Sequence, residues 1–274
     1  MRCRVLCAVA CSSMARPPVQ MRTARLVCSA ASSSAPNPIA DALDTIRSKV
    51  KTATSSAERD GAPPRLVAVS KTKPVELLQA AYDAGQRDFG ENYVQELITK
   101  APLLPDDIAW RFIGKLQSNK AKPLVQGVRS LAAVETVDTA KLADRLQTAV
   151  AGLEPPRATS LGVFIQVNTS PWEGSKGGVL AEEVLPLAEH IRAKCPGLQL
   201  CGLMTIGAPD DASCFAALRQ CRDDLASRLG VSSSDLELSM GMSGDFEVAI
   251  AAGSDSVRVG SSIFGQRDYP AKAA

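Results

Sequence analysis

Short apolar runs and amphipathic helical runs alternate along almost the whole of this 274-residue chain. Strict alternation predicts parallel strands joined by right-handed helical crossovers, and eight strands is the number that closes a (β/α)8 TIM barrel. Such a barrel commonly uses about 250 residues, so one domain suffices. An open, doubly wound sheet is the alternative. The eight apolar runs are 66–70, 87–90, 108–113, 130–134, 161–168, 198–204, 236–240 and 256–259.

Helical patterns lie before and between these strands. Ile39, Leu43, Ile46 and Val50 have the spacing of one helix face, which predicts a leading N-terminal helix over residues 39–52. The other main helices are predicted at 75–84, 139–151, 180–194, 211–229 and 246–252.

The first 37 residues differ in composition from the rest of the chain. They contain arginine but no acidic residue, many Ser and Ala, and a small-residue stretch at 27–31. This composition predicts an organelle transit peptide ahead of a barrel domain at residues 38–274. The stretch at 27–31 favours a plastid over a mitochondrion. A disordered extension without a targeting role is the alternative.

Charge and hydropathy argue against two classes of partner. The formal net charge is +2, but five arginines lie in the leader, and without them the 29 acidic residues outnumber the basic ones. A near-neutral body has no sequence-wide electrostatic reason to bind nucleic acid or an anionic membrane. No apolar run reaches the roughly 18 residues of a membrane span. We expect neither partner, and we expect a monomer.

Residues for metal or triad chemistry are scarce. The chain has one histidine, His190, which we interpret as a helix-surface residue. Four of the eight cysteines lie in the leader, the others form no CxxC pair, and Cys214 and Cys221 have the spacing of a buried helix face. We expect neither a zinc site nor a disulfide framework.

Two lysines follow the first strand, where a barrel places its functional loops. Lys71 directly follows the run LVAVS and so lies at the barrel mouth, whereas Lys73 precedes Pro74 and is expected to point to water. A lysine amine near apolar walls or other cations loses its proton more readily, as a Schiff-base nucleophile must. From Lys71 alone, a solvated loop lysine is the favoured interpretation.

The loops after the last two strands predict an anion site. The first contains Gly241, Met242 and Ser243, of which Ser243 suits a helix N-cap and Gly241 allows close backbone approach. The second adds Gly260 and Ser261. Barrels often bind phosphate between these two loops. Two ordinary glycine-containing turns are the alternative.

Arg258 belongs to the eighth strand itself. Facing outward, it would pair with a helix acid, and facing inward it would be an expensive buried charge unless it had a partner. In the inward orientation, its guanidinium is expected to reach a ring nitrogen of a phosphate-anchored heterocycle and to keep that nitrogen unprotonated.

Six ordered motifs over about residues 39–270 resemble one family. The strings VAVSKTKP, DFGENYVQE, FIGKLQSNK, GLMTI, LSMGMSGDFEVAIAAGS and VRVGSSIFGQRDY are similar to the pyridoxal phosphate homeostasis protein family, which shares the barrel of the alanine racemase N-terminal domain. The resemblance implies a non-enzymatic carrier for vitamin B6 homeostasis. It would hold pyridoxal 5'-phosphate (PLP) as a Schiff base on Lys71 and pass it on, with PLP-requiring apoenzymes as candidate acceptors.

The resemblance also implies roles for single residues. Asn92 matches the pocket asparagine, Arg258 matches the contact to the pyridine nitrogen, and the anion site at 241–243 and 260–261 matches the phosphate site. Lys115 is a departure, because relatives more often carry His or Pro there. Lys176, in the SKGG string, is a candidate second amine for PLP, and an exposed loop lysine is the favoured alternative.

Two enzymes remain as alternatives. A PLP-dependent amino-acid racemase needs a base on each face of the cofactor, commonly lysine and tyrosine, and this chain has only Tyr82, Tyr93 and Tyr269. A base from another subunit would keep this alternative open, although arginine at the pyridine nitrogen weakens the electron sink. A Schiff-base sugar-phosphate aldolase would need no PLP. We favour the carrier.

Overall fold

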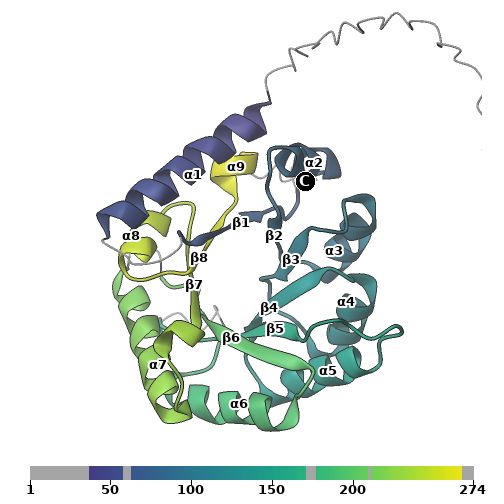
Figure 1. The fold of residues 1–274 in the computed structure, drawn as a ribbon, viewed down its shortest axis with the longest axis vertical. Helices are drawn as coiled ribbons and strands as arrows, with labels where there is room; N and C mark the ends of the chain where they lie inside the picture. The colour runs from purple at the N-terminus through teal and green to yellow at the C-terminus, as the bar shows by residue number, and fades with distance from the viewer. Residues whose placement is uncertain (1–36, 58–62, 171–176, 209–210, 267–274) are drawn as a thin grey trace, which may run out of the picture. The chain divides into compact units, whose positions relative to one another are not determined.

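The computed structural model describes residues 37–57, 63–170, 177–208 and 211–266. Its eight parallel strands close into a barrel in sequence order, with β8 paired to β1, as the alternation of the sequence predicts (Figure 1). The alternative prediction, an open doubly wound sheet, is therefore wrong. The strands are β1 (Arg65–Val69), β2 (Asp88–Glu91), β3 (Ala109–Phe112), β4 (Leu131–Val137), β5 (Leu161–Gln166), β6 (Leu198–Met204), β7 (Glu237–Met242) and β8 (Ser256–Val259).

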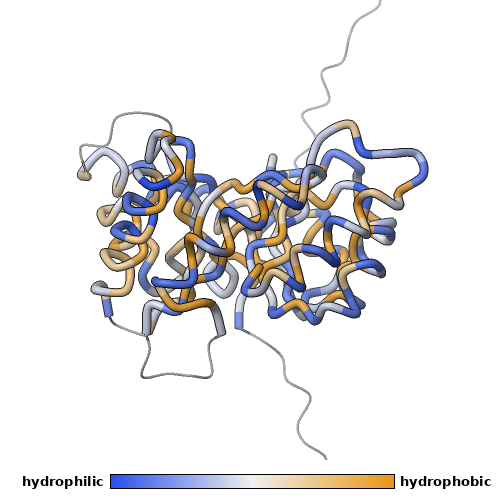
Figure 2. Tube along the Cα trace, turned by 90° about the horizontal axis from the view of Figure 1, so that it is seen from below, coloured by the Kyte–Doolittle hydropathy of each residue, from blue (hydrophilic) through white to orange (hydrophobic). Residues whose placement is uncertain are grey.

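Helices surround the strands, and the tube in Figure 2 alternates between hydrophobic and hydrophilic residues along them, as expected for helices with one apolar face. Six of them match the predicted helical segments, whereas the short α3, α4 and α9 were not predicted. The α-helices are α1 (Pro38–Ser56), α2 (Val75–Asp83), α3 (Val94–Lys100), α4 (Ala121–Gly127), α5 (Ala140–Ala151), α6 (Ala181–Lys194), α7 (Ser213–Leu229), α8 (Phe246–Ala251) and α9 (Ser261–Phe264).

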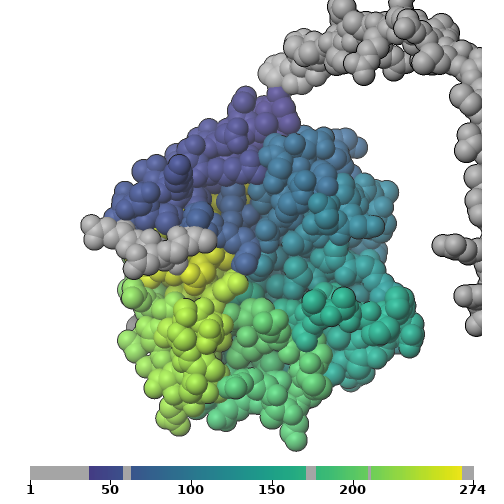
Figure 3. Space-filling view, in the orientation of Figure 1, coloured from purple at the N-terminus to yellow at the C-terminus, as the bar shows by residue number. Residues whose placement is uncertain are grey.

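The leading helix is confirmed as α1. Its N-cap is Asn37, whose side chain accepts hydrogen bonds from the amides of Ile39 and Ala40 at 3.1 and 3.3 Å. The predicted apolar face is buried against the rest of the barrel domain. α1 packs against α2, α8 and α9, so it covers the seam where the first and last strands meet (Figures 1 and 3).

β4 is longer than the sequence pattern predicts, and the extra residues are Glu135, Thr136 and Val137. Glu135 is fully buried and accepts hydrogen bonds from Arg111 at 2.9 Å and from Ser239 at 2.6 Å. Arg111 also bonds Asp88 at 3.0 Å. These contacts link β2, β3, β4 and β7 by charged and polar groups, and each buried charge among them has a partner, as burial requires.

Candidate functional site

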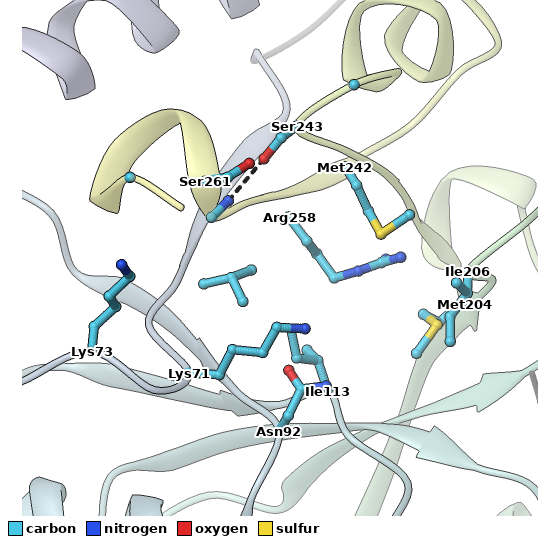
Figure 4. A pocket seen from close by; sticks show the side chains of 14 residues that line it. Lys71, Lys73, Asn92, Ile113, Met204, Ile206, Met242, Ser243, Arg258 and Ser261 are labelled. Carbon is cyan, nitrogen blue, oxygen red and sulfur yellow. Dashed lines mark hydrogen bonds between the residues drawn. The ribbon is translucent and has the colours of Figure 1, made fainter. Parts of the chain in front are cut away.

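A cavity of about 330 Å³ opens among the loops that follow the strands (Figure 4). This volume falls at the small end of the usual range for ligand pockets, roughly 300–1,000 Å³. Seven of the eight predicted binding residues line it, and Gly241 directly precedes two of them. Those seven are Lys71, Asn92, Met242, Ser243, Arg258, Gly260 and Ser261.

Lys71 extends from the end of β1 into this cavity, beside Asn92 (Figure 4). The next residue, Thr72, has a φ of 61°, which is uncommon for a residue other than glycine. Its amide donates to the Glu96 carboxylate at 2.6 Å. The backbone beside Lys71 is therefore held in a specific conformation by a side chain from another element.

The prediction that Lys73 points to water is wrong. Its side chain is buried and lines the cavity, and its Nζ donates to the Gln266 carbonyl at 2.5 Å. Figure 4 shows this amine pointing away from Lys71. Gln266 lies 193 positions further along the chain, so local sequence could not have predicted the contact.

The two loops of the predicted anion site are joined by a hydrogen bond, since the Gly260 amide donates to Ser243 Oγ at 3.1 Å (Figure 4). Ser243 is therefore not the helix N-cap that we predicted. The N-cap of α8 is Asp245, whose carboxylate accepts the Met242 amide at 2.6 Å. Ser261 begins α9, so its amide has no carbonyl acceptor within the helix.

Glycine is required at Gly241, and a side chain at Gly260 would fit only tightly. Gly241 has a φ of 93°, and a Cβ there would lie 2.5 Å from the Cβ of Ala249. A Cβ on Gly260 would lie 3.2 Å from the Val69 carbonyl oxygen. The site is thus built from tightly packed backbone, as the predicted close approach requires.

Arg258 faces inward, and its side chain is buried at the floor of the cavity. It donates to Ser239 Oγ and to the Thr205 carbonyl, both at 2.7 Å. Burial lowers the pKa of the guanidinium, and the Glu135 and Asp245 carboxylates oppose that shift. A guanidinium has five N–H donors, so two fixed bonds leave donors for a ligand.

Asn92 supplies a buried oxygen, Oδ1, that has no hydrogen-bond partner. The loop after β3 approaches this residue so closely that a Cβ on Gly114 would lie 2.1 Å from the Asn92 carbonyl oxygen. An unsatisfied amide inside a cavity is costly unless a ligand pairs with it. The residues present therefore fit a polar, phosphorylated heterocycle that carries an aldehyde.

Among the described residues that line the cavity, none is a tyrosine, a histidine or an acid. Tyr93 is 56% exposed, and the Tyr82 hydroxyl donates to Asp107 on the outer surface. Lys115 is also exposed and does not line the cavity, although its charge lowers the pKa of Asp138 against the larger raising effect of burial.

His190 lies on α6 and joins it to α5 through a 2.7 Å hydrogen bond with Asp144. Cys195 is close enough that ligand atoms of all three residues lie within 4.8 Å. Tetrahedral zinc would hold nitrogen and oxygen ligands about 3.4 Å apart. His190 Nε2 and Asp144 Oδ1 are closer than that, at 2.7 Å, so we describe their contact as a hydrogen bond that joins α6 to α5. The expected role of His190 as a helix-surface residue did not include this contact.

Comparison with known proteins identifies the family. The model of the alanine racemase N-terminal domain matches residues 42–268. A pyridoxal phosphate homeostasis protein of Bos taurus is 45% identical over 260 residues, covering 89% of this chain and 92% of that protein. One from Schizosaccharomyces pombe is 47% identical over 231 residues, covering 82% and 91%.

This chain belongs to the pyridoxal phosphate homeostasis protein family. Among solved structures, PipY of Synechococcus elongatus with PLP bound superposes with a TM-score of 0.67 at 33% identity, covering 83% of this chain and all of PipY. Alanine racemase of Clostridium difficile is 15% identical, with a TM-score of 0.61. That likeness shows the fold alone, and this chain spans 58% of the racemase.

Three predictions lie outside the described residues. They concern the transit peptide, Lys176 and Tyr269. In the part of the chain that is described, no helix is both long and apolar enough to cross a membrane.

Proposed function

We propose that this chain binds PLP in the cavity at the barrel mouth, holds it as a Schiff base on Lys71 and releases it to PLP-requiring apoenzymes. The observation that carries the proposal is that Lys71, the anion site and Arg258 line one cavity. PLP, when bound, supplies an aldehyde that combines reversibly with a primary amine. The membership of this chain in the pyridoxal phosphate homeostasis protein family supports the proposal, as does its similarity to PipY, which was solved with PLP bound.

Each side of the cavity has a separate task in this proposal. The backbone amides at 243–244 and 261 would bind the phosphate, because helix starts and glycine-rich turns favour anions. Arg258 would donate to the pyridine nitrogen, and its bonds to Ser239 and Thr205 hold the guanidinium in place for that contact. Asn92 would pair with a polar group near the reactive carbon.

A carrier is favoured over a racemase because the described cavity has no acid–base residue opposite Lys71. Met204 and Ile206 contribute apolar side chains to its lining instead. We expect no alanine racemase turnover in the enzymatic range of roughly 1–1,000 per second. A coupled assay with D- and L-alanine tests this, and turnover in that range would establish the racemase alternative.

An absorbance spectrum of the purified protein separates the carrier from the aldolase alternative. Bound PLP gives a visible Schiff-base band that borohydride removes, whereas an aldolase without PLP gives none. Peptide mapping after reduction then identifies the modified lysine. A spectrum without that band, even after PLP is added in excess, would contradict the proposal.

We further propose that residues 1–37 direct the protein to a plastid, that it acts as a monomer, and that its partners include neither nucleic acid nor membrane. Support for targeting comes from the arginine-rich, acid-free composition of this segment. Fusing residues 1–37 to a fluorescent protein tests the address. Fluorescence in mitochondria would favour the alternative, and diffuse fluorescence would contradict a targeting role.

A further inference from the structure

Lys100 is a buried lysine outside the cavity, at the end of α3. It is 6% exposed, and its Nζ makes three short contacts, to the Glu91 carboxylate at 2.8 Å, the Glu96 carboxylate at 2.5 Å and the Ser70 carbonyl at 2.8 Å. We call Glu91, Glu96 and Lys100 the ion cluster. A lysine with all three donors satisfied by fixed acceptors has a defined position.

Every member of the ion cluster forms a hydrogen bond with Ser70 or Thr72, the two residues that flank Lys71. Lys100 binds the carbonyl of Ser70, and Glu91 accepts the Ser70 hydroxyl at 2.7 Å. Glu96 accepts the amide of Thr72 at 2.6 Å. The cluster therefore holds the residue before Lys71 and the residue after it. We call residues 70–72 the Lys71 loop.

This loop needs such support because Thr72 has a positive φ of 61°. A non-glycine residue in that region is strained and persists only when its surroundings hold it. The cluster is also sensitive to loss of its cation. Glu91 is fully buried, and its Oε2 has no hydrogen-bond partner. The carboxylate therefore depends on the positive charge of Lys100, whose Nζ lies 2.8 Å from Glu91 Oε1.

We propose that Lys100 is a positioning residue for Lys71, holding the 70–72 backbone through Glu91 and Glu96 so that the Lys71 amine points into the cavity. The inference rests on the proposed function, in which that amine forms the Schiff base. It predicts that losing the ion cluster impairs formation of the covalent bond but not binding of the phosphate, because the anion site lies on β7 and β8.

The test measures the rate of Schiff-base formation on mixing the apoprotein with PLP, followed by absorbance. Lys100→Met removes the cation and is expected to slow formation roughly 10-fold to 100-fold, the scale of a misplaced reacting group. Lys100→Arg should restore most of the rate. If Lys100→Met unfolds the protein, a substitution at the half-buried Glu96 gives a second measurement. Glu96→Ala frees the Thr72 amide and should also slow formation.

Two control variants separate positioning from general destabilisation. Arg157→Met removes a half-buried cation that donates to the Leu131 carbonyl at the start of β4. Glu182→Ala removes an exposed acid from the first turn of α6, the turn that the half-buried Glu96 occupies in α3. Both should leave the formation rate unchanged. In a Lys71→Ala background, Lys100→Met should leave the affinity for PLP unchanged.

An unchanged formation rate in folded Lys100→Met, or in Glu96→Ala, would overturn the positioning role. So would an equal slowing in Arg157→Met. Failure of the proposed function has a different signature, because wild-type protein itself would then carry no borohydride-fixed label on Lys71.

Discussion

The two sides of the cavity are built by different means. On the β1 and β2 side, Lys71 depends on a cluster of buried charges contributed by α3 and β2. On the β7 and β8 side, the predicted anion site depends on close backbone packing at Gly241, which requires glycine, and on the hydrogen bond from the Gly260 amide to Ser243 Oγ. The difference indicates that covalent attachment and phosphate binding are separable by mutation.

Lys71→Ala is expected to have the largest effect, namely complete loss of the Schiff-base band with the fold intact. A partly buried lysine at the barrel mouth contributes little packing, and the anion site remains. PLP should therefore still bind, though weakly, in equilibrium dialysis. Unfolding of this variant in circular dichroism would show that Lys71 is structural.

The same variant tests Lys176 as a second amine. If Lys176 captures PLP when Lys71 is absent, borohydride reduction of Lys71→Ala labels Lys176, and the double variant with Lys176→Ala loses that label. No label on Lys176 in Lys71→Ala would remove the second site.

Ser243→Asp breaks the other side of the cavity. It places a carboxylate against the phosphate and removes the bond from the Gly260 amide. We expect PLP affinity to fall about 100-fold, or about 3 kcal/mol, the scale of a lost charge-assisted contact with added repulsion. Ser234→Asp, at an exposed serine outside the cavity, should change affinity little. Unchanged affinity in Ser243→Asp would mean that the phosphate binds elsewhere.

Gly241→Ala and Gly230→Ala form a matched pair. Both glycines have positive φ, but a Cβ at Gly241 would clash with Ala249, whereas a Cβ at Gly230 would have no atom within 4 Å. We expect Gly230→Ala to lower the free energy of unfolding by about 1 kcal/mol and Gly241→Ala by about 2 kcal/mol or more. Only Gly241→Ala should also weaken PLP binding. Equal losses in urea unfolding would contradict the close packing at Gly241.

The smallest expected effect is at the N-terminus, away from both sides of the cavity. A chain starting at Asn37 should fold and bind PLP like the full chain, because Asn37 caps α1. Starting at Pro38 should cost about 1 kcal/mol of stability through loss of that cap. Loss of PLP binding on removing residues 1–36 would contradict the independence of the barrel.

The sequence predicted the barrel and the cavity residues because both leave local signals. Strand periodicity located all eight strands, and the glycine and serine motifs after the last two strands located two loops that line the cavity. Contacts between distant segments leave no such signal. Lys73 was misjudged because its partner, Gln266, lies at the other end of the domain, and Ser243 because its partner is in the next loop.

The supporting charges were missed for a related reason. Glu96 and Lys100 have the spacing of an ordinary exposed helix pair, and only the fold shows that both contact the residues beside Lys71. Glu135 was missed because the predicted fourth strand ended one residue before it. A signal was nevertheless present, since Glu135 directly follows an apolar strand run in a barrel, and a glutamate buried there needs a partner.

The central claim is that Lys71 carries PLP, and peptide mapping of wild-type protein after borohydride reduction tests it most directly. With PLP added at one equivalent, we predict that the reduced label lies on Lys71. A label predominantly on Lys73, whose amine is bound to the Gln266 carbonyl, or on no lysine at all, would contradict the account.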